Sequence, residues 1–283
     1  MLKKRLRRVH KKQLGSIIIV VGSRTMPGAG ILTASAAQRS GAGLITAAYP
    51  SNLSKVYQSV LPEVLHMPLH QTKSGTLGGK AYQKIIQTQA TMDAGVIGPG
   101  LSRNAATQKV CIHVIQKFQK PLVIDADGLN AIADSGSVTT MLRKRKQITI
   151  ITPHEGEMAR LTKVTSKKIT ENRIAIAKKF AHVWDTIIVL KGYKTVIAGP
   201  DSTVLVNETG GPALATAGSG DVLSGIISTL VAQNISQPLR ATAVAVALHG
   251  SAGDQAAAEL GERSVTASDL ISILPSILTQ YGA

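Results

Sequence analysis

A short glycine-rich run near residue 220 carries the strongest chemical signal in the chain. It reads Gly218-Ser219-Gly220-Asp221 and leads into the apolar segment Val222–Val231, which predicts a helix. Glycines let a ligand approach the backbone closely, and the free N–H groups at a helix start attract phosphate. An aspartate there can cap the helix, or it can act as a general base beside a phosphoryl group. The run predicts a phosphate site with Asp221 as the candidate catalytic base.

Five further loops carry polar residues and glycines directly after short apolar runs. They cover residues 22–30, 98–100, 125–130, 152–157 and 191–195. The end of a strand by itself explains any one of them. In a parallel sheet, however, the carboxyl ends of neighbouring strands share one edge, and ligands gather there. Together the loops predict a ligand site along that edge.

The elements that must position these loops alternate between short apolar runs and helix-length segments. The predicted strands are Ile17–Val21, Leu44–Ala48, Ala94–Ile97, Leu122–Ile124, Ile148–Ile151, Ile187–Leu190, Val196–Ala198 and Val204–Val206. The predicted helices include Ala29–Ser40, Lys80–Thr91, Ala105–Phe118, Ser166–Val183 and Leu239–Leu260. This order predicts an α/β fold with a mostly parallel central sheet and helices on both faces. The last two strands are expected to form a hairpin at one edge. We expect one domain over residues 15–283, preceded by a basic arm at residues 1–14.

The charge of the chain is concentrated at its start. Thirty-two Lys and Arg against sixteen Asp and Glu give a formal charge of +16, and residues 3–12 alone hold seven basic side chains. A solvated arm explains this run, and binding to a polyanion or an anionic membrane surface is the alternative. Five Tyr, two Phe and one Trp are too few for base-stacking platforms, so we expect no specific nucleic acid partner.

Composition excludes several classes of protein. A single cysteine, Cys111, rules out an intramolecular disulfide and multi-cysteine metal centres. No apolar run approaches the roughly 18–20 residues of a membrane helix, so we expect no membrane partner and a cytoplasmic location. The chain also lacks the glycine loop with Lys-Ser/Thr that P-loop enzymes use.

The glycine run and the loops together resemble one known family. Residues 218–221 at the head of an apolar helix are similar to the anion-hole and base motif of the ribokinase-like superfamily. The NAD(P)H-hydrate dehydratase family of that superfamily has similar motifs in the same order. The matching segments here are 22–30, 39–44, 98–101, 125–130, 152–154, 190–192 and 207–223. The resemblance runs from about residue 15 to 278 and implies a ribokinase-like fold.

The resemblance implies a repair enzyme. Such an enzyme uses ADP or ATP to dehydrate the S epimer of NADH or NADPH hydrate, and a magnesium ion accompanies the nucleotide. Asp221 would take the proton of the substrate hydroxyl, and the backbone of residues 218–220 would stabilise the transferring phosphoryl group. A separate NAD(P)H-hydrate epimerase as partner and a homo-oligomer, a tetramer in this family, are further implications.

The resemblance also assigns roles to individual residues. Substrate contacts are implied for Gly30, Gly100, His154 and Asp221, and nucleotide contacts for Lys191, Gly192, Tyr193, Lys194, Thr195, Gly218, Ser219 and Gly220. For His154, a capping or structural role is the alternative.

Other polar residues near these motifs have weaker assignments. Glu157 is expected to hold the magnesium ion through water, although a glutamate at a helix start has its own stabilising role. Asn130 is the candidate ligand of its loop. For Asp125 and Asp127, capping and turn roles explain the residues about as well as a substrate contact does. His249 is expected in the core or an interface.

Three positions depart from the family pattern. Glu155 and Glu208 stand where the family usually has proline, and each adds negative charge near a phosphate-rich site, which bears on nucleotide affinity. Residues 11–15 replace a Lys-Gly-Asp-type turn, which bears on an N-terminal substrate contact.

Two other functions stay open. A ribokinase-like kinase for a vitamin precursor or sugar would use the same Asp221 and glycine run. A polyanion-binding protein on this fold would explain the basic arm and leave Asp221 without a task. Deleting residues 1–12 separates the classes, since an enzyme keeps turnover and a polyanion binder loses affinity.

Overall fold

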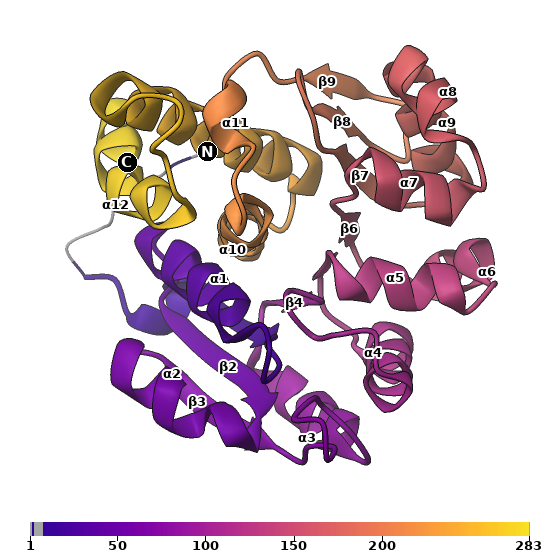
Figure 1. Ribbon diagram of the computed structural model, residues 1–283, viewed down its shortest axis with the longest axis vertical. Helices are drawn as coiled ribbons and strands as arrows, with labels where there is room; N and C mark the ends of the chain where they lie inside the picture. The colour runs from indigo at the N-terminus through magenta and orange to yellow at the C-terminus, as the bar shows by residue number, and fades with distance from the viewer. Residues whose placement is uncertain (1, 3–7, 283) are drawn as a thin grey trace.

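A single nine-stranded sheet forms the centre of the molecule (Figure 1). The structure is a computed structural model, and it describes residue 2 and residues 8–282. Its strands are β1 Ser16–Val20, β2 Leu44–Pro50, β3 Leu65–Leu69, β4 Ala94–Ile97, β5 Leu122–Ile124, β6 Thr149–Ile151, β7 Ile187–Leu190, β8 Val196–Ala198 and β9 Val204–Val206. The spatial order is β3-β2-β1-β4-β5-β6-β7-β8-β9. Neighbouring strands from β3 through β7 pair in parallel. β8 is antiparallel to β7, and β9 is antiparallel to β8. The predicted mostly parallel sheet and the edge hairpin are confirmed.

Helices follow most of the strands. The longer ones are α1 Pro27–Arg39, α4 Ala105–Lys117, α9 Arg173–Trp184, α10 Ser219–Gln233, α11 Pro238–Leu260 and α12 Ala267–Gln280. The shorter ones are α2 Ser54–Val60, α3 Ala81–Thr88, α5 Asp127–Asp134, α6 Val138–Lys144, α7 Glu155–Thr162 and α8 Ser166–Glu171. Four 3₁₀ turns are η1 Lys11–Leu14, η2 Ser51–Leu53, η3 Gln89–Thr91 and η4 Pro212–Leu214.

The two faces of the sheet carry separate apolar cores. Alternate residues of β1 point to opposite faces, so Ile17 and Ile19 pack with α1, α10, α11 and α12, while Ile18 and Val20 pack with α3 to α9. Figure 1 shows α1, α10 and α12 on one side of the strands and α4, α5 and α6 on the other. A sheet buried on both faces explains why the strands are nearly continuous apolar runs.

Two elements differ from the expectation. The edge strand β3 was not predicted, because His66 and Pro68 interrupt its apolar pattern, and an edge position tolerates both its proline and its exposed side chains. The single helix expected over Ser166–Val183 is two helices, α8 and α9. Asn172, with φ −134° and ψ 38°, separates them.

The start of the described chain packs onto the domain. The Lys11 carbonyl oxygen packs closely on Gly43, because a Cβ added at Gly43 would lie only 1.8 Å from it. Gln233 Nε2 also donates a hydrogen bond to the Leu14 carbonyl at 3.0 Å. Thus η1 is joined to β2 and α10. Residues 3–7 of the predicted basic arm lie outside the described residues.

Within the described part of the chain, no helix combines the length and the apolar character needed to cross a membrane.

Candidate active site

The glycine run forms the turn into α10. Gly218 adopts φ +86°, and a Cβ there would lie 2.4 Å from Leu32 Cδ1, so both backbone and space require glycine. Ser219 then begins α10, a helix of fifteen residues. The first backbone N–H groups of such a helix have no partner within it and carry its positive end. The turn therefore has a geometry that suits an anion, and its phosphate-binding role stays a prediction.

Asp221 lies in the first turn of α10 and is half-buried. The pKa of its carboxyl is raised to about 7, chiefly by burial and also by the negative charge of Asp125, while Lys191 opposes the rise. A carboxyl with a pKa near neutrality can accept a proton at physiological pH and release it again. Asp221 thus has the proton affinity of a general base.

Beside Asp221, a buried carboxylate ties three elements together. Asp125, at the end of β5, is 1% exposed. Its Oδ1 accepts from Lys191 Nζ at 2.8 Å, and its Oδ2 accepts from Ser224 Oγ of α10 at 2.9 Å. Both oxygens are therefore engaged within the protein. Asp125 orients Lys191 from the end of β7 and holds the first turns of α10 against the sheet.

Lys191 lies between two acidic groups. Besides Asp125, Glu157 Oε2 of α7 is 4.0 Å from Lys191 Nζ. Burial alone would lower the pKa of Lys191, but the charges of Asp125 and Glu157 outweigh burial and raise it. The ammonium group is therefore charged at any physiological pH. At Gly220 a Cβ would come within 3.2 Å of this Nζ, so the glycine leaves room for the cation next to the α10 turn.

The predicted nucleotide loop follows Lys191. Gly192 has φ +143°, and a Cβ there would lie 2.7 Å from the Arg173 guanidinium. Tyr193 is 80% exposed, and Lys194 Nζ lies 5.8 Å from its ring centroid. Thr195 accepts a backbone hydrogen bond from Asn207 at 2.9 Å, which joins this loop to the turn before α10. The exposed ring offers an open surface beside the buried Lys191.

The predicted substrate glycines Gly30 and Gly100 lie near the start of α1. Gly30 of α1 packs closely against Tyr57, because a Cβ added at Gly30 would lie 2.2 Å from Tyr57 Oη. A Cβ added at Gly22 would lie 2.3 Å from the same oxygen. Tyr57 Oη donates to the Pro27 carbonyl at 3.0 Å. Gly100, with φ +64°, would place a Cβ 2.8 Å from the Cβ of Ala29. The structure thus brings Gly30 and Gly100 together around the start of α1.

His154 caps α7. Its Nδ1 accepts from the backbone N–H groups of Gly156 and Glu157 at 3.0 and 3.4 Å, while Glu157 Oε2 accepts from the His154 N–H at 2.9 Å. Its Nε2 lies 3.6 Å from Glu157 Oε2, but the side chain is still 55% exposed, so a ligand can reach the ring. The capping role that the sequence left open for His154 is present, and it is compatible with a substrate contact.

The side chain of Asn130 is hydrogen-bonded within its own loop. Its Nδ2 donates to Asp127 Oδ1 at 3.1 Å, and its Oδ1 is buried without a hydrogen-bond partner. Asp127 also accepts from the Ser102 N–H at 2.7 Å. Asp127 thus joins the Asn130 amide to the loop after β4, and an Asn130 contact with substrate through Nδ2 needs a movement of that amide.

Glu157 fits the water-mediated magnesium role better than direct ligation. Its carboxylate is 7% exposed, and Oε2 is taken by the His154 N–H and by the approach of Lys191. No hydrogen bond from the described residues engages Oε1, which leaves this oxygen as an acceptor for a metal-bound water. Among residues 2 and 8–282, no cluster of three or more His, Cys, Asp or Glu could hold a metal ion. The residues fit an ion that the nucleotide carries.

The two glutamates that depart from the family pattern lie in different environments. Glu155 is paired with Arg173 at 2.5 Å and accepts from Thr170 Oγ1 at 2.9 Å. Arg173 also donates to the Leu190 carbonyl at 2.8 Å, so this pair braces the start of the nucleotide loop. Glu208 is exposed. Of these two glutamates, therefore, only Glu208 adds a negative charge that has no partner among the described residues.

Several residues around the site were not singled out by the sequence. They are Ser224 beneath Asp125, Tyr57 beneath Gly30 and Arg173 beside Gly192. His249 was expected only as a core or interface residue, and it is buried beside Ser219. Tyr57, Arg173 and His249 come from other elements than the residues they contact, and Ser224 follows the glycine run on α10 but meets a carboxylate 99 residues away, so no local motif could have identified these contacts.

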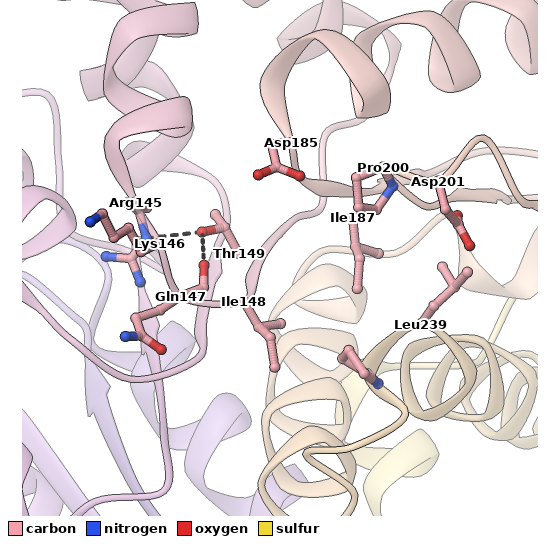
Figure 2. Close-up of a pocket in the computed structure, with 11 residues that line it drawn as sticks. Arg145, Lys146, Gln147, Ile148, Thr149, Asp185, Ile187, Pro200, Asp201 and Leu239 are labelled. Atoms are coloured by element: carbon pink, nitrogen blue, oxygen red, sulfur yellow. Dashed lines mark hydrogen bonds between the residues drawn. The ribbon is translucent and has the colours of Figure 1, made fainter.

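A separate cavity of about 410 Å³ lies at the opposite, amino-terminal edge of the sheet (Figure 2). Its wall includes Ile148 and Ile187, next to the starts of β6 and β7, and Leu239 of α11. The figure shows Lys146 on one side and Asp185 and Asp201 on the other. None of the predicted site residues lines this cavity.

Comparisons with known proteins agree on one family. A sequence model of the family described as NAD(P)H-hydrate dehydratase matches residues 17–276. The Bifunctional NAD(P)H-hydrate repair enzyme Nnr of Moorella thermoacetica is 43% identical over 269 residues, which are 95% of this chain and 50% of that protein. The ADP-dependent (S)-NAD(P)H-hydrate dehydratase of Neisseria meningitidis is 36% identical over 87% of this chain and 78% of that protein.

A solved structure also matches. The ADP/ATP-dependent NAD(P)H-hydrate dehydratase from Bacillus subtilis, co-crystallised with ATP/Mg²⁺, superposes with a TM-score of 0.84 at 31% identity, over 99% of this chain and 94% of that chain. The predicted ribokinase-like fold is confirmed. This chain spans about half the length of the bifunctional relatives it matches.

Proposed function

The chain belongs to the NAD(P)H-hydrate dehydratase family, and we propose that it dehydrates the S epimer of NADH or NADPH hydrate with ADP or ATP as phosphoryl donor. The observation that carries the proposal is Asp221, a half-buried carboxyl with a pKa near 7 at the mouth of the α10 glycine turn. A base in that position can act on a hydroxyl that faces a bound phosphoryl group.

The reaction we propose has two stages. Asp221 takes the proton of the hydroxyl on the hydrated nicotinamide ring, and that oxygen attacks the terminal phosphorus of the nucleotide. The bond to the leaving nucleotide oxygen breaks, which yields AMP from ADP or ADP from ATP. Phosphate then leaves the ring carbon, driven by the lone pair of the ring nitrogen. Loss of a proton from the neighbouring ring carbon restores the double bond of the reduced cofactor.

The residues around Asp221 have matching tasks. Backbone N–H groups of residues 218–220 would stabilise the negative charge of the transferring phosphoryl group, and Lys191 would add a fixed positive charge beside them. Residues 191–195 would hold the nucleotide, and Gly30, Gly100 and His154 would contact the hydrate. A magnesium ion carried by the nucleotide would neutralise phosphate charge, held through water by Glu157 Oε1.

The proposal extends to partners and assembly. A separate NAD(P)H-hydrate epimerase would supply the S epimer from the R epimer. For a homo-oligomer, the exposed Leu260 at the end of α11 and Tyr281 after α12 offer apolar contacts. Light scattering coupled to gel filtration measures the subunit number, with a tetramer expected. A cytoplasmic location remains our expectation.

The decisive experiment measures recovery of reduced nicotinamide absorbance. The protein is mixed with NADH hydrate, magnesium and either ADP or ATP, with Asp221→Asn as control. Nucleotide-dependent recovery that disappears in D221N supports both the dehydratase and its base. Absence of recovery with a folded wild-type protein would move the assignment to a small-molecule kinase on the same scaffold.

A further inference from the structure

One helix of the molecule contacts both halves of the candidate phosphoryl-transfer site without belonging to either. This helix is α11, and its middle section, residues 247–254, lies against the turn at residues 207–210 and against the first residue of α10. The side chains that make these contacts are not among the residues implied by the family resemblance.

The first contact fixes the glycine turn. His249 is buried, and its Nε2 lies 3.0 Å from the Ser219 carbonyl oxygen and 3.1 Å from Ser219 Oγ. Because a carbonyl oxygen only accepts, Nε2 carries the proton and donates to it. Burial lowers the pKa of His249 to about 4, so the ring is neutral and keeps this donor role across the physiological range. The residue that begins the anion turn is therefore tied to α11.

The second contact fixes the turn before α10. Asp254 Oδ2 accepts from the Gly210 N–H at 2.8 Å, and the Ala247 carbonyl accepts from Thr209 Oγ1 at 3.1 Å. Asn207 of the same turn donates its backbone N–H to Thr195, the last residue of the predicted nucleotide loop. Asp254 thus acts on the nucleotide loop through the turn.

Two glycines of α11 allow this approach. A Cβ on Gly250 would lie 2.1 Å from Thr209 Oγ1, and a Cβ on Gly253 would lie 2.6 Å from Leu214 Cδ2. Glycine inside a helix is less favourable than alanine, so contact with the loop is the compensating feature. The face of α11 toward residues 207–214 is therefore shaped to its neighbour.

We propose that α11 is the positioning element of the site, with His249 and Asp254 as two separate positioning residues. His249 holds the anion turn where the phosphoryl group transfers, and Asp254 holds the turn and loop where the nucleotide binds. The inference rests on the proposed function, and it predicts that the two residues act on different kinetic parameters.

The test compares disruptive and conservative variants at each position. Asp254→Ala removes the acceptor, whereas Asp254→Asn keeps an oxygen acceptor. His249→Phe keeps the ring volume without a donor, whereas His249→Gln keeps an N–H donor. Ser251→Ala is the matched control, because Ser251 lies on the same helix and its side chain is hydrogen-bonded to the Tyr281 hydroxyl after α12, away from the turn at residues 207–210.

The readouts are kcat, the nucleotide KM, and the nucleotide Kd from calorimetry with ADP or ATP alone. Loss of one hydrogen bond weakens an interaction by about fivefold. We expect D254A to raise KM and Kd by about fivefold with kcat within about twofold, and D254N to restore binding. We expect H249F to lower kcat by about tenfold at an unchanged Kd, since the transition-state donors of the turn are displaced. H249Q restores most of that kcat.

Several outcomes overturn the inference. One is an equal loss of nucleotide affinity in D254A and D254N, and another is an effect of H249F on kcat no larger than that of S251A. A third is a set of parallel changes in kcat and Kd that follow a fall in melting temperature. Nucleotide binding that depends on Asp254 in a protein without hydrate turnover would instead reject the dehydratase and keep the Asp254 part of the inference. A wild-type protein that binds neither ADP nor ATP would reject both.

Discussion

At the scale of single residues, the site is a small electrostatic network in which two carboxylates and one ammonium group set the proton affinity of a third carboxylate. Burial makes the largest contribution to the raised pKa of Asp221, Asp125 and Asp127 raise it as well, and Lys191 lowers it. Asp125 and Lys191 are themselves joined at 2.8 Å. The network therefore gives Asp221 a pKa near 7 with a charged partner fixed beside it.

The raised pKa of Asp221 predicts the pH profile of the reaction. A base works only when deprotonated, so kcat/KM for the hydrate should fall tenfold for each pH unit below about 7 and level off above it. Turnover measured from pH 5 to 9 checks this expectation. In Asp221→Asn we expect at least a thousandfold loss at all pH values. A profile that stays flat down to pH 5 would contradict the role of Asp221.

Asp125→Asn and Lys191→Met should move that profile in opposite directions. Removing the negative charge of Asp125 lowers the pKa of Asp221, so the acid limb moves to lower pH. Removing the positive charge of Lys191 raises the pKa, so the limb moves to higher pH. D125N should also lower the free energy of unfolding by about 3 kcal/mol, because it breaks a largely buried pair. Shifts of the same sign in both variants would rule out this electrostatic account.

At the scale of elements, close packing around α1 and α10 explains the glycines better than flexibility does. Gly218 turns the chain with a positive φ, but Gly30 lies inside α1 with ordinary helical geometry. Gly30 is required because Tyr57 of α2 fills the space where a side chain would lie. Burial raises the pKa of Tyr57, so its hydroxyl stays protonated as the donor to Pro27.

Gly30 and Gly28 form a matched pair within α1. A Cβ on Gly28 would meet nothing within 4 Å, whereas one on Gly30 would collide with Tyr57. We expect Gly28→Ala to leave the unfolding free energy unchanged or raised by up to about 1 kcal/mol. Gly30→Ala should lower it by about 1–3 kcal/mol through overpacking and raise the hydrate KM several-fold. Denaturant unfolding and hydrate kinetics measure both effects, and equal behaviour of the two variants would refute the packing argument.

At the scale of the whole molecule, the sheet separates the candidate site from the cavity of Figure 2. The site loops extend from the carboxyl ends of the strands, and the cavity lies at the amino ends of β6 and β7. The positive charge is concentrated elsewhere, in a dense basic run of the sequence before η1. Since η1 packs on Gly43 and Gln233, a truncation that leaves η1 intact ends before His10, whose side chain caps η1, and removes the packing of Leu2 on the core.

Removing residues 1–9 therefore tests the basic arm without disturbing η1. We expect the truncated protein to keep kcat and KM within about twofold, because η1 and the site loops remain. Binding to a polyanion, measured against salt concentration, should lose its steep slope as the basic side chains are removed. Loss of turnover with an unchanged melting temperature would show that the arm takes part in the reaction.

The sequence alone predicted the class of fold, the strands other than β3 and the position of the helix after the glycine run. It did so because apolar alternation and glycine turns are local signals, readable within a dozen residues. The loops of the candidate site also follow from the sequence, since every strand before β8 ends at one edge of the sheet. Their individual binding roles stay predictions.

Only the tertiary structure decided which side chains meet. Asp125 and Lys191 are 66 residues apart, and Asp125 and Ser224 are 99 apart. Such contacts depend on strand order and on how helices cross the sheet, and these are set by packing of the whole core. For the same reason the sequence allowed a capping or turn role for Asp125, but its central place between Lys191 and α10 emerged only once the strands were assembled.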